Sequence, residues 1–409
     1  MADSYDRYER RAPRSRDAAL LRDLRGILSV SRSRATILRT QLKGIDIAAL
    51  KSRADFAQIP VLRKSELIAR QTETPPFGGA CGTRPGALQH LLMSPSAIFQ
   101  PAGHAKDWWN SARALFAAGI RKGDIVLNCF SYHFTPDGHM IDCGARALGC
   151  PVIPAGDSDV EATLAVTGHY RPVAYCGPAA YLETLVQESK TRASGIASID
   201  RAFIGGSKTA SIPKADLAAH GIAIYEAYMT GDLGVVAYES EAREALIVNE
   251  GLVVEIVKPG TNEPLPAGQI GEIVVTRLNA DYPLLRFGTG DLSCVVAGQS
   301  SCGRTNMRIR SPMGRVDESL EIAGRIIAPA HVLEIGAGYA DLRRLRLIVR
   351  DRGSLTLQVE SAIDGAALRD KLAATLFAVT RIKGAIEIVP PGGLPADGRL
   401  ICDERRQQD

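Results

Sequence analysis

The sequence has no uninterrupted apolar run of about 18 residues, the length that a membrane-spanning helix requires. No short apolar segment follows the N-terminus, so nothing predicts export through a signal peptide. The formal net charge of +4 is small for 409 residues and gives no reason to expect nucleic acid as a partner. With 45% hydrophobic and 23% charged residues, the composition is typical of a globular protein, and we expect a cytoplasmic one that does not bind membranes.

The pattern of cysteines does not indicate a disulfide framework, because none of the eight forms a Cys-x-x-Cys pair. Several, such as Cys129, lie in apolar stretches, which is typical of buried thiols in a reducing compartment. His133, Asp137 and His139 are close enough in sequence to suggest a metal site. They lie on a loop with Gly and Pro and lack a further carboxylate or thiolate at a fixed spacing, so the pattern does not favour a metal.

Arginine is concentrated between residues 7 and 39, a distribution that could indicate a transit peptide or a helix on a membrane surface. Two aspartates interrupt this stretch, which argues against both alternatives. Four leucines recur with the spacing of one helix face, namely Leu20, Leu21, Leu24 and Leu28. We therefore predict a helix that packs its leucines against the body of the protein and exposes its other face.

A chain of this length is expected to form two or three domains. Segments with helical periodicity alternate with short β-rich runs over residues 108–204, an order typical of parallel βαβ units. Ligands of such folds bind beyond the C-terminal ends of the strands. Residues 203–207 and 224–232 are strand-to-loop transitions of this kind.

The character of the sequence changes after residue 236, where residues 252–257 and 271–276 predict antiparallel strands joined by a turn. From about residue 317 the pattern indicates a smaller unit that mixes helices and strands. The predicted fold class is α/β, with parallel βαβ units and a small antiparallel β unit in a large lobe. The predicted boundaries are a large lobe of residues 1–312, including a helical part (1–70) and an antiparallel part (236–312), and a small mobile α+β lobe of residues 313–409.

Two short motifs in the second half of the chain bear most directly on function. In residues 283–292 an apolar run leads to Arg286 and then to a Gly-x-Gly turn that presents Asp291. One ionised carboxylate can accept hydrogen bonds from both hydroxyls of a ribose. A second motif, Gly-Arg-x-Asp at residues 314–317, follows where the small lobe begins. Because a loop aspartate after glycines is more often a turn residue or a helix cap, each motif alone also fits a purely structural role.

The order of these segments is similar to that of the adenylate-forming acid ligases, and the chain resembles the phenylacetate–CoA ligase family over nearly its whole length. The resemblance rests on residues 60–64, 76–79, 119–124, 149–154 and 265–272, followed by the two motifs above. It implies that a carboxylate attacks ATP to give an acyl-adenylate and pyrophosphate, after which coenzyme A displaces AMP. The implied partners are ATP, coenzyme A and a carboxylic acid with an apolar or aryl body, and the chain is a candidate homodimer.

By this resemblance Asp291 holds the ribose hydroxyls, Arg315 lies near the nucleotide, and Asp317 is the hinge about which the small lobe turns. Thr230 and Arg399 join Asp317 as candidate catalytic residues. The remaining candidates are Gly205, Gly206, Ser207, Tyr228, Ser94 and Ser96 for the nucleotide, and Tyr132, His133 and Phe134 for an apolar or aryl acid.

The stretch that corresponds to the family's phosphate loop, residues 93–103, departs from the expected Ser/Thr/Gly-rich pattern. Glycines in such a loop allow backbone N–H groups to converge on phosphate oxygens. Pro95 and Pro101 remove two of these donors, and the stretch has no lysine. Ser94 and Ser96 are the donors that remain.

The chain departs from the family pattern at three further places. The glutamate expected to hold magnesium falls at Gly231, with Asp232 next to it as a candidate replacement, and the C-terminal lysine is replaced by Arg399. The thiols that bind zinc in many relatives are reduced to one, because the positions concerned are Ser240, Ser300 and Cys302. We therefore expect no zinc.

Two functions from different classes follow. The first is an acid–thiol ligase of a divergent branch, favoured by the intact Asp291, hinge motif and small lobe. The second is a nucleotide- or acyl-CoA-binding protein of the same fold that no longer adenylates, favoured by the joint change of the phosphate loop, the metal ligand and the lysine. The sequence favours the ligase, because a role can shift between neighbours such as Gly231 and Asp232.

Overall fold

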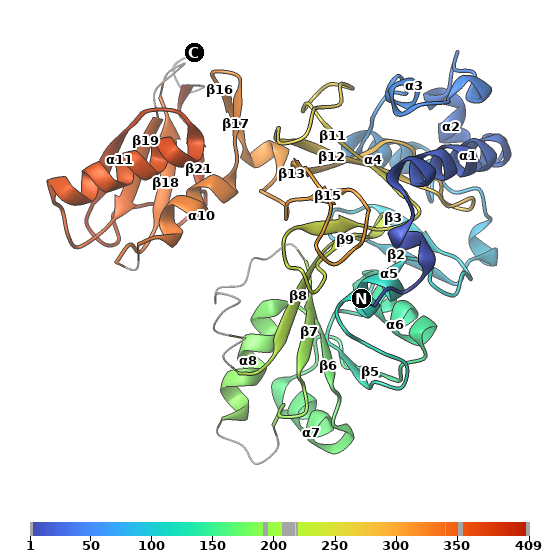
Figure 1. Ribbon diagram of the computed structural model, residues 1–409, viewed down its shortest axis with the longest axis horizontal. Coiled ribbons are helices and arrows are strands. Elements are labelled where there is room, and N and C mark those ends of the chain that lie inside the picture. Colours follow the sequence, from blue (N-terminus) through green and yellow to red (C-terminus); the bar gives the residue numbers. More distant parts are fainter. Residues whose placement is uncertain are drawn as a thin grey trace. The chain divides into compact units, whose positions relative to one another are not determined.

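The computed structural model describes residues 3–190, 195–206, 217, 220–339, 341–350 and 355–405. The chain divides into two compact units (Figure 1). Unit 1 comprises Met1–Gly268, Val274–Thr289 and Val295–Ser311, and unit 2 comprises Gln269–Ile273, Gly290–Cys294 and Pro312–Asp409. The predicted boundary at residues 312 and 313 lies next to the start of the long segment of unit 2, and the mobility of the small lobe stays a prediction.

The N-terminal part of unit 1 is helical, as the arginine- and leucine-rich pattern predicts. Its elements are η1 (Arg7–Arg10), α1 (Pro13–Ser31), α2 (Thr36–Gln41), η2 (Ile47–Ala49), α3 (Arg53–Ala57) and α4 (Lys64–Glu73). The four leucines of α1 are all buried, so the predicted apolar face is confirmed. Arg16 is also buried on α1, where its Nε donates to Glu250 Oε1 at 2.8 Å and so neutralises its charge.

The largest sheet of unit 1 has the strand order β14-β15-β10-β9-β8-β7-β6-β4-β5. Its strands are β4 (Val126–Asn128), β5 (Val152–Pro154), β6 (Ala174–Gly177), β7 (Arg201–Ile204), β8 (Ala223–Thr230), β9 (Gly234–Tyr238), β10 (Leu246–Val248), β14 (Val295–Val296) and β15 (Arg308–Ile309). Strands β5, β4, β6, β7 and β8 pair in parallel, and the pairs from β8 to β9 onward are antiparallel. The predicted βαβ order is thus confirmed.

Helices connect the parallel strands, namely α6 (Asp137–Leu148), α7 (Val160–Tyr170) and α8 (Ala179–Ser189), and α5 (Ser111–Ala117) precedes β4. Helix α6 contacts β4 and β5, and α8 contacts β6. The core between them is built from fully buried side chains such as Leu127, Tyr175 and Leu182. This arrangement places the C-terminal end of β7 beside the middle of β8, because Ile204 pairs with Glu226 and β8 continues to Thr230.

Two smaller sheets complete unit 1. The hairpin of β2 (His90–Met93) and β3 (Phe99–Ala102) follows η3 (Pro85–Ala87). The other sheet has the order β1-β13-β12-β11, with β1 (Leu62–Arg63), β11 (Leu252–Val257), β12 (Gly271–Arg277) and β13 (Phe287–Ser293). Here Arg286 is fully buried and its Nε donates to Glu255 Oε2 at 2.9 Å. Strands β12 and β13 each contain residues of both units.

The long segment of unit 2 forms a small α+β domain, as predicted. It contains η4 (Val316–Glu318), the hairpin of β16 (Leu320–Ile322) and β17 (Arg325–Ile327), helices α10 (Pro329–Ala337) and α11 (Ala366–Thr380), and strands β18 (Leu345–Val349), β19 (Leu355–Glu360), β20 (Gly384–Val389) and β21 (Ile401–Asp403). Its sheet has the order β20-β19-β18-β21, and its core includes Ile335, Leu357 and Leu376. In the described parts of the chain, no helix has both the length and the apolar character needed to cross a bilayer.

Candidate active site

The two motifs singled out in the sequence contact each other within unit 2. Arg315 Nη1 donates to Asp291 Oδ1 at 3.2 Å, and the two residues also form an isolated β-bridge. The backbone N–H of Leu292 donates to Gly314 O at 2.8 Å, which fixes the register of the two segments. The Asp291 side chain is 18% exposed, so its carboxylate is not enclosed in a packed interior. A group in this setting can bind a ligand hydroxyl.

Both glycines that flank this contact are required by the backbone. Gly290 has a φ of 78°, and a Cβ atom there would lie 3.0 Å from Arg315 Nη2. Gly314 has a φ of 121°, and a Cβ atom there would lie 2.5 Å from Pro329 Cδ at the start of α10. A larger residue at position 314 would displace Pro329 at the start of α10, whereas at position 290 the positive φ is the stronger reason for glycine.

Arg315 also contacts the predicted hinge residue, because its Nε donates to Asp317 Oδ1 at 3.1 Å. The Asp317 side chain is 72% exposed and that of Arg315 is 41% exposed. Ion pairs with this exposure contribute about 0–1 kcal/mol to stability. The main effect of this ion pair is therefore to orient the Arg315 side chain between the carboxylates of Asp291 and Asp317. The role of Asp317 as a hinge stays a prediction.

The predicted phosphate loop is a tight turn between β2 and β3 that uses its own donors. The backbone N–H of Ser94 donates to Ile98 O at 2.9 Å, and that of Ala97 donates to Ser94 O at 2.9 Å. The N–H of Ile98 donates to Ser94 Oγ at 3.3 Å, and Pro95 has no N–H. Ser94 is buried, whereas Ser96 is exposed at the tip. The loop therefore presents few of the free backbone donors that an anion cradle needs.

Asp232 is held by a residue of the same hairpin. Gln100 Nε2 donates to Asp232 Oδ1 at 2.6 Å, although the two residues are 132 positions apart. Burial raises the pKa of the Asp232 carboxyl, while the positive charge of Lys64 acts in the opposite direction. A Cβ atom at Gly231 would lie 2.7 Å from Pro136 Cγ and 2.8 Å from Gln100 Oε1. A glutamate at position 231 would therefore have to displace both neighbours.

The predicted acid-binding residues have different surroundings. Tyr132 is partly buried, its hydroxyl accepts from Asn128 Nδ2 at 2.7 Å, and burial raises the pKa of the phenol. Phe134 is 74% exposed, and His133 Nε2 lies 3.3 Å from Asp157 Oδ1 at the surface. His139 contacts the carbonyl of Tyr132 instead of joining His133. The roles of all three residues as walls of an acid pocket stay predictions.

The predicted nucleotide residues on the parallel sheet lie at the C-terminal ends of β7 and β8. Gly205 follows β7, and a Cβ atom there would lie 2.8 Å from Met229 Sδ on β8. Tyr228 is buried on β8, and Thr230 at its end accepts at Oγ1 from the N–H of Leu233 at 3.3 Å. Gly206 has a φ of 110°. Ser207 lies outside the described residues.

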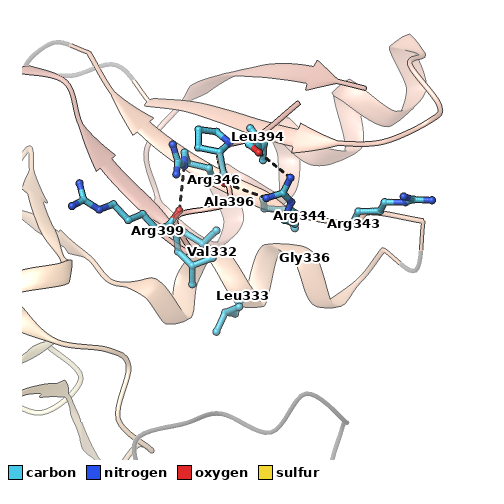
Figure 2. Close-up of a pocket in the computed structure, with 13 residues that line it drawn as sticks. Val332, Leu333, Gly336, Arg343, Arg344, Arg346, Leu394, Ala396 and Arg399 are labelled. Atoms are coloured by element: carbon cyan, nitrogen blue, oxygen red, sulfur yellow. Dashed lines mark hydrogen bonds between the residues drawn. The ribbon is translucent and has the colours of Figure 1, made fainter. Parts of the chain in front are cut away.

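Arg399 lies at the edge of a cavity of about 480 Å³ in unit 2 (Figure 2). Val332, Leu333 and Leu394 form an apolar part of its lining. Figure 2 shows the side chains of Arg343 and Arg399 extending away from each other at opposite ends of this cavity. An exposed guanidinium on a loop is free to reach an anion, which agrees with the predicted role of Arg399 and leaves that role to be tested.

Two further arginines shape the loop that carries Arg399. Arg344 Nη2 donates to Glu360 Oε1 at 2.5 Å and to Leu394 O at 2.8 Å. Arg346 pairs with Asp397, and its Nε donates to Arg399 O at 3.2 Å. This arginine cluster was not among the residues predicted from the sequence, although the close spacing of Arg343 and Arg344 before β18 and Arg346 within it was a usable signal.

Known proteins similar to this chain include curated phenylacetate–coenzyme A ligases. The protein of Thermus thermophilus is 29% identical over 330 residues, which is 76% of this chain and 73% of that protein. The protein of Aromatoleum evansii is 27% identical over 341 residues, covering 78% and 75% of the two chains. No protein-family model matches the chain. The chain is a relative of the phenylacetate–coenzyme A ligases.

Solved structures of CoA ligases share the fold of this chain. A crystal structure of 2-hydroxyisobutyryl-CoA ligase in an open conformation, in complex with 2-HIB-AMP and CoA, matches with a TM-score of 0.85 at 22% identity and covers 98% of this chain and 95% of that chain. An anthranilate CoA ligase in complex with anthranoyl-AMP matches with a TM-score of 0.53 at 15% identity, covering 95% and 80%. The predicted α/β fold class is confirmed.

The residues of this ligase relative do not fit the zinc that the family resemblance implies. Ser240, Ser300 and Cys302 do gather, but they offer one thiol where a structural zinc needs four ligands of the thiolate or imidazole type. Burial raises the pKa of Cys302, but hydrogen bonds from both serines and from Arg304 outweigh it and leave the pKa below its usual value. Arg304 itself donates to Glu9 Oε1 at 3.0 Å. A guanidinium thus supplies the positive charge at this place.

The described residues offer magnesium isolated carboxylates instead of a cluster of ligands. The described residues contain no group of three or more His, Cys, Asp or Glu side chains that could hold a metal ion. Magnesium in nucleotide enzymes is often held by one or two carboxylates and the substrate phosphates. Asp232 is the predicted carboxylate, yet one of its oxygens already accepts from Gln100. Its role as a magnesium ligand stays a prediction.

Proposed function

We propose that this protein is an AMP-forming acid–coenzyme A ligase that activates an aryl or other apolar carboxylic acid with ATP. The observation that carries the proposal is the pairing of Asp291 with Arg315 in a chain that is similar over 76% of its length to a phenylacetate–coenzyme A ligase. The carboxylate, the adjacent guanidinium and the exposed Asp317 are together in unit 2. This arrangement suits the recognition of a ribose diol.

In the first half-reaction, a carboxylate oxygen of the acid attacks the α-phosphorus of ATP. The new P–O bond gives the acyl-adenylate, and the bond to the β-phosphate oxygen breaks to release pyrophosphate. Asp291 accepts hydrogen bonds from the ribose hydroxyls, and Arg315 orients that carboxylate. Arg399 supplies a positive charge that offsets the charge developing on the phosphates, as preorganised cations do in phosphoryl and acyl transfer.

In the second half-reaction, the sulfur of coenzyme A attacks the acyl carbon and AMP leaves with the electron pair of the acyl–oxygen bond. The thiol proton passes to solvent. Asp317 is the proposed pivot for the change between the two steps. Tyr132 forms one wall of the acid pocket, because its partly buried ring offers an apolar face while Asn128 binds its hydroxyl.

The hairpin of β2 and β3 favours a second candidate, a nucleotide- or acyl-CoA-binding protein of the same fold that no longer adenylates. Its turn uses three backbone donors within the loop, and Gly231 has no room for a metal-binding side chain. In the ligase, the phosphates must therefore be bound mainly by side chains instead of by backbone donors of this loop.

Acid-dependent exchange of pyrophosphate into ATP separates the two candidates. With a panel of aryl and aliphatic acids, the ligase is expected to catalyse exchange with at least one acid, because exchange reports the reversible first half-reaction. Isothermal titration with ATP and acyl-CoA runs in parallel. If no acid supports exchange while the nucleotide still binds, the ligase proposal fails and the binding protein is favoured. Size exclusion with light scattering tests the predicted homodimer in the same preparation.

A further inference from the structure

A second cavity, of about 290 Å³, lies within unit 1 and is lined by none of the predicted site residues. Its walls come from the start of β2, the segment that follows β3, the beginning of the α5 region and one face of α6. Small-molecule sites usually have volumes from about 300 Å³ upward. The space is therefore at the lower end of the range for a small organic ligand and larger than one ion needs.

The charged side chains of this cavity are mainly basic. Lys106 and Arg146 are positive at neutral pH and Asp142 is negative, which leaves one net positive charge before any histidine is counted. Arg146 Nε donates to Asp142 Oδ2 at 2.7 Å, so that pair is neutral in sum. Among the described residues, no acidic side chain forms a salt bridge with Lys106, which lines the cavity. The rim residue His104 adds a further group that can carry positive charge.

Histidine and tryptophan supply the remaining polar groups. The rings of His90 and His139 lie 4.6 Å apart. Burial lowers the pKa of His90, and the neighbouring positive groups His139 and Arg146 add to this effect while Asp142 opposes it. Burial is the larger cause, and a bound anion would offset the smaller contribution of the neighbouring positive charges.

Two buried polar atoms of this lining have no partner among the described residues, His90 Nδ1 and Trp108 Nε1. Trp108 is 3% exposed, and an indole N–H is only a donor, so it needs an acceptor. The Arg277 guanidinium covers the Trp108 ring at 4.8 Å from the centroid, which brings another positive charge close to the cavity. Donors and positive charges around the space call for an anionic acceptor.

The described residues that line this cavity are not arranged to bind a metal ion. Although His90, His139, Asp142 and Cys143 line the cavity, the described residues hold no group of three or more such side chains arranged to bind a metal ion. Cys143 is already used, since its thiol donates to Lys106 O at 3.2 Å and accepts from the N–H of Trp108 at 3.3 Å. These contacts fix the backbone that carries Lys106 and Trp108.

We propose that this cavity binds the phosphate group of a phosphate monoester, with Lys106 as the principal cation and the rings of Trp108 and Trp109 beside the organic part. Lysine is a compact cation that binds phosphate as a point charge. The monoester has two conceivable sources. One is the 3′-phosphate of coenzyme A, which rests on the proposed function, and the other is a separate phosphorylated metabolite that acts as an effector.

The test uses the full-length protein and two readouts. Trp108 and Trp109 are the two tryptophans of the whole chain, so intrinsic tryptophan fluorescence reports on this cavity. Isothermal titration calorimetry measures binding at any site of the protein, including sites that are far from the two tryptophans. The titrants are phenyl phosphate, phenylacetate as a carboxylate of similar size, coenzyme A and dephospho-coenzyme A. The variants are Lys106→Ala and the matched control Lys122→Ala, which changes an exposed lysine outside the cavity.

We expect phenyl phosphate to bind with saturable heat and a matching change in fluorescence, and Lys106→Ala to weaken it about tenfold or more while Lys122→Ala does not. If coenzyme A behaves in the same way and dephospho-coenzyme A binds about tenfold more weakly, the occupant is the co-substrate. If coenzyme A leaves the fluorescence unchanged, the occupant is a separate effector.

Three results would overturn the proposal. They are no saturable binding of phenyl phosphate, binding of phenyl phosphate without a change in tryptophan fluorescence, and equal affinity for phenylacetate and phenyl phosphate. If Lys106→Ala and Lys122→Ala change the affinity for phenyl phosphate equally, Lys106 is not the principal cation of the site. Because acid-dependent pyrophosphate exchange requires none of these residues, the cavity proposal and the ligase proposal can fail independently.

Discussion

The replacement Asp291→Asn tests the ribose assignment with little change in shape. The asparagine keeps one oxygen acceptor but loses the charge that strengthens both hydrogen bonds to the diol. Hydrogen bonds to charged groups contribute about 1.5–3 kcal/mol each, and neutral ones about 0.5–1.5 kcal/mol. The difference over two bonds is about 2–3 kcal/mol, so we expect AMP to bind roughly 30- to 150-fold more weakly. Isothermal titration with AMP measures this change.

The structure offers a matched control for this experiment. Asp317 is the other carboxylate that binds Arg315, but its side chain is 72% exposed whereas that of Asp291 is 18% exposed. Asp317→Asn therefore removes a similar contact to Arg315 without removing the proposed ribose ligand, and we expect AMP affinity to change less than about threefold. Thermal unfolding should be nearly the same for both variants. If Asp291→Asn binds AMP as tightly as Asp317→Asn does, the ribose assignment is wrong.

Three further predictions follow from the geometry. Arg399→Ala should lower the rate of acyl-adenylate formation by about 100-fold, the size of effect that the loss of one preorganised charge produces, with ATP affinity nearly unchanged; rapid-quench assays measure it, and equal rates would mean that Arg399 is only a surface residue. Gly231→Glu should lower the free energy of unfolding by about 1–3 kcal/mol through overpacking. The control Gly26→Ala, at a helical position with no neighbouring atom within 4 Å, should be neutral or stabilising, and a stable Gly231→Glu protein would contradict the crowding. A chelator should leave the melting temperature unchanged, because one thiol at Cys302 cannot hold a structural zinc, and a fall of several degrees that zinc reverses would refute this reading.

Much of the fold could be predicted from local patterns. The leucine spacing of α1, the alternation of helices and β-rich runs up to β8, and the mixed pattern after residue 317 each reflect periodicities that the backbone imposes. Asp291 and Arg315, which were assigned from the sequence to the ribose and to the vicinity of the nucleotide, contact each other, and their roles stay predictions. These signals are readable because they depend on neighbouring residues or on short motifs.

The features that the sequence did not predict depend on contacts between residues far apart in the chain. Gln100 and Asp232 are 132 positions apart, and no local pattern indicates that the amide binds the carboxylate or that Gly231 is crowded by Pro136. The internal hydrogen bonds of the turn at Ser94 depend on the backbone angles of the hairpin, including a φ of 60° at Ala97. Side-chain packing of this kind appears only when the strands are placed.

The surroundings of Cys302 illustrate the same limit. The serines at positions 240 and 300 could be read from the sequence, and the absence of zinc that they suggest stays a prediction. The sequence did not indicate that Arg304 would approach Cys302 and pair with Glu9, which is 295 positions away. A buried ion pair with good geometry is required there, because an unpaired guanidinium inside the protein would be strongly destabilising.

The most direct test of the ligase function is a single-reaction measurement of AMP and acyl-coenzyme A in the presence of ATP, coenzyme A and each of a panel of carboxylic acids. The account predicts that at least one aryl or apolar acid yields AMP and acyl-coenzyme A in equal amounts, and that neither forms when the acid is omitted. A protein that binds ATP and coenzyme A but forms neither product with any acid would contradict it.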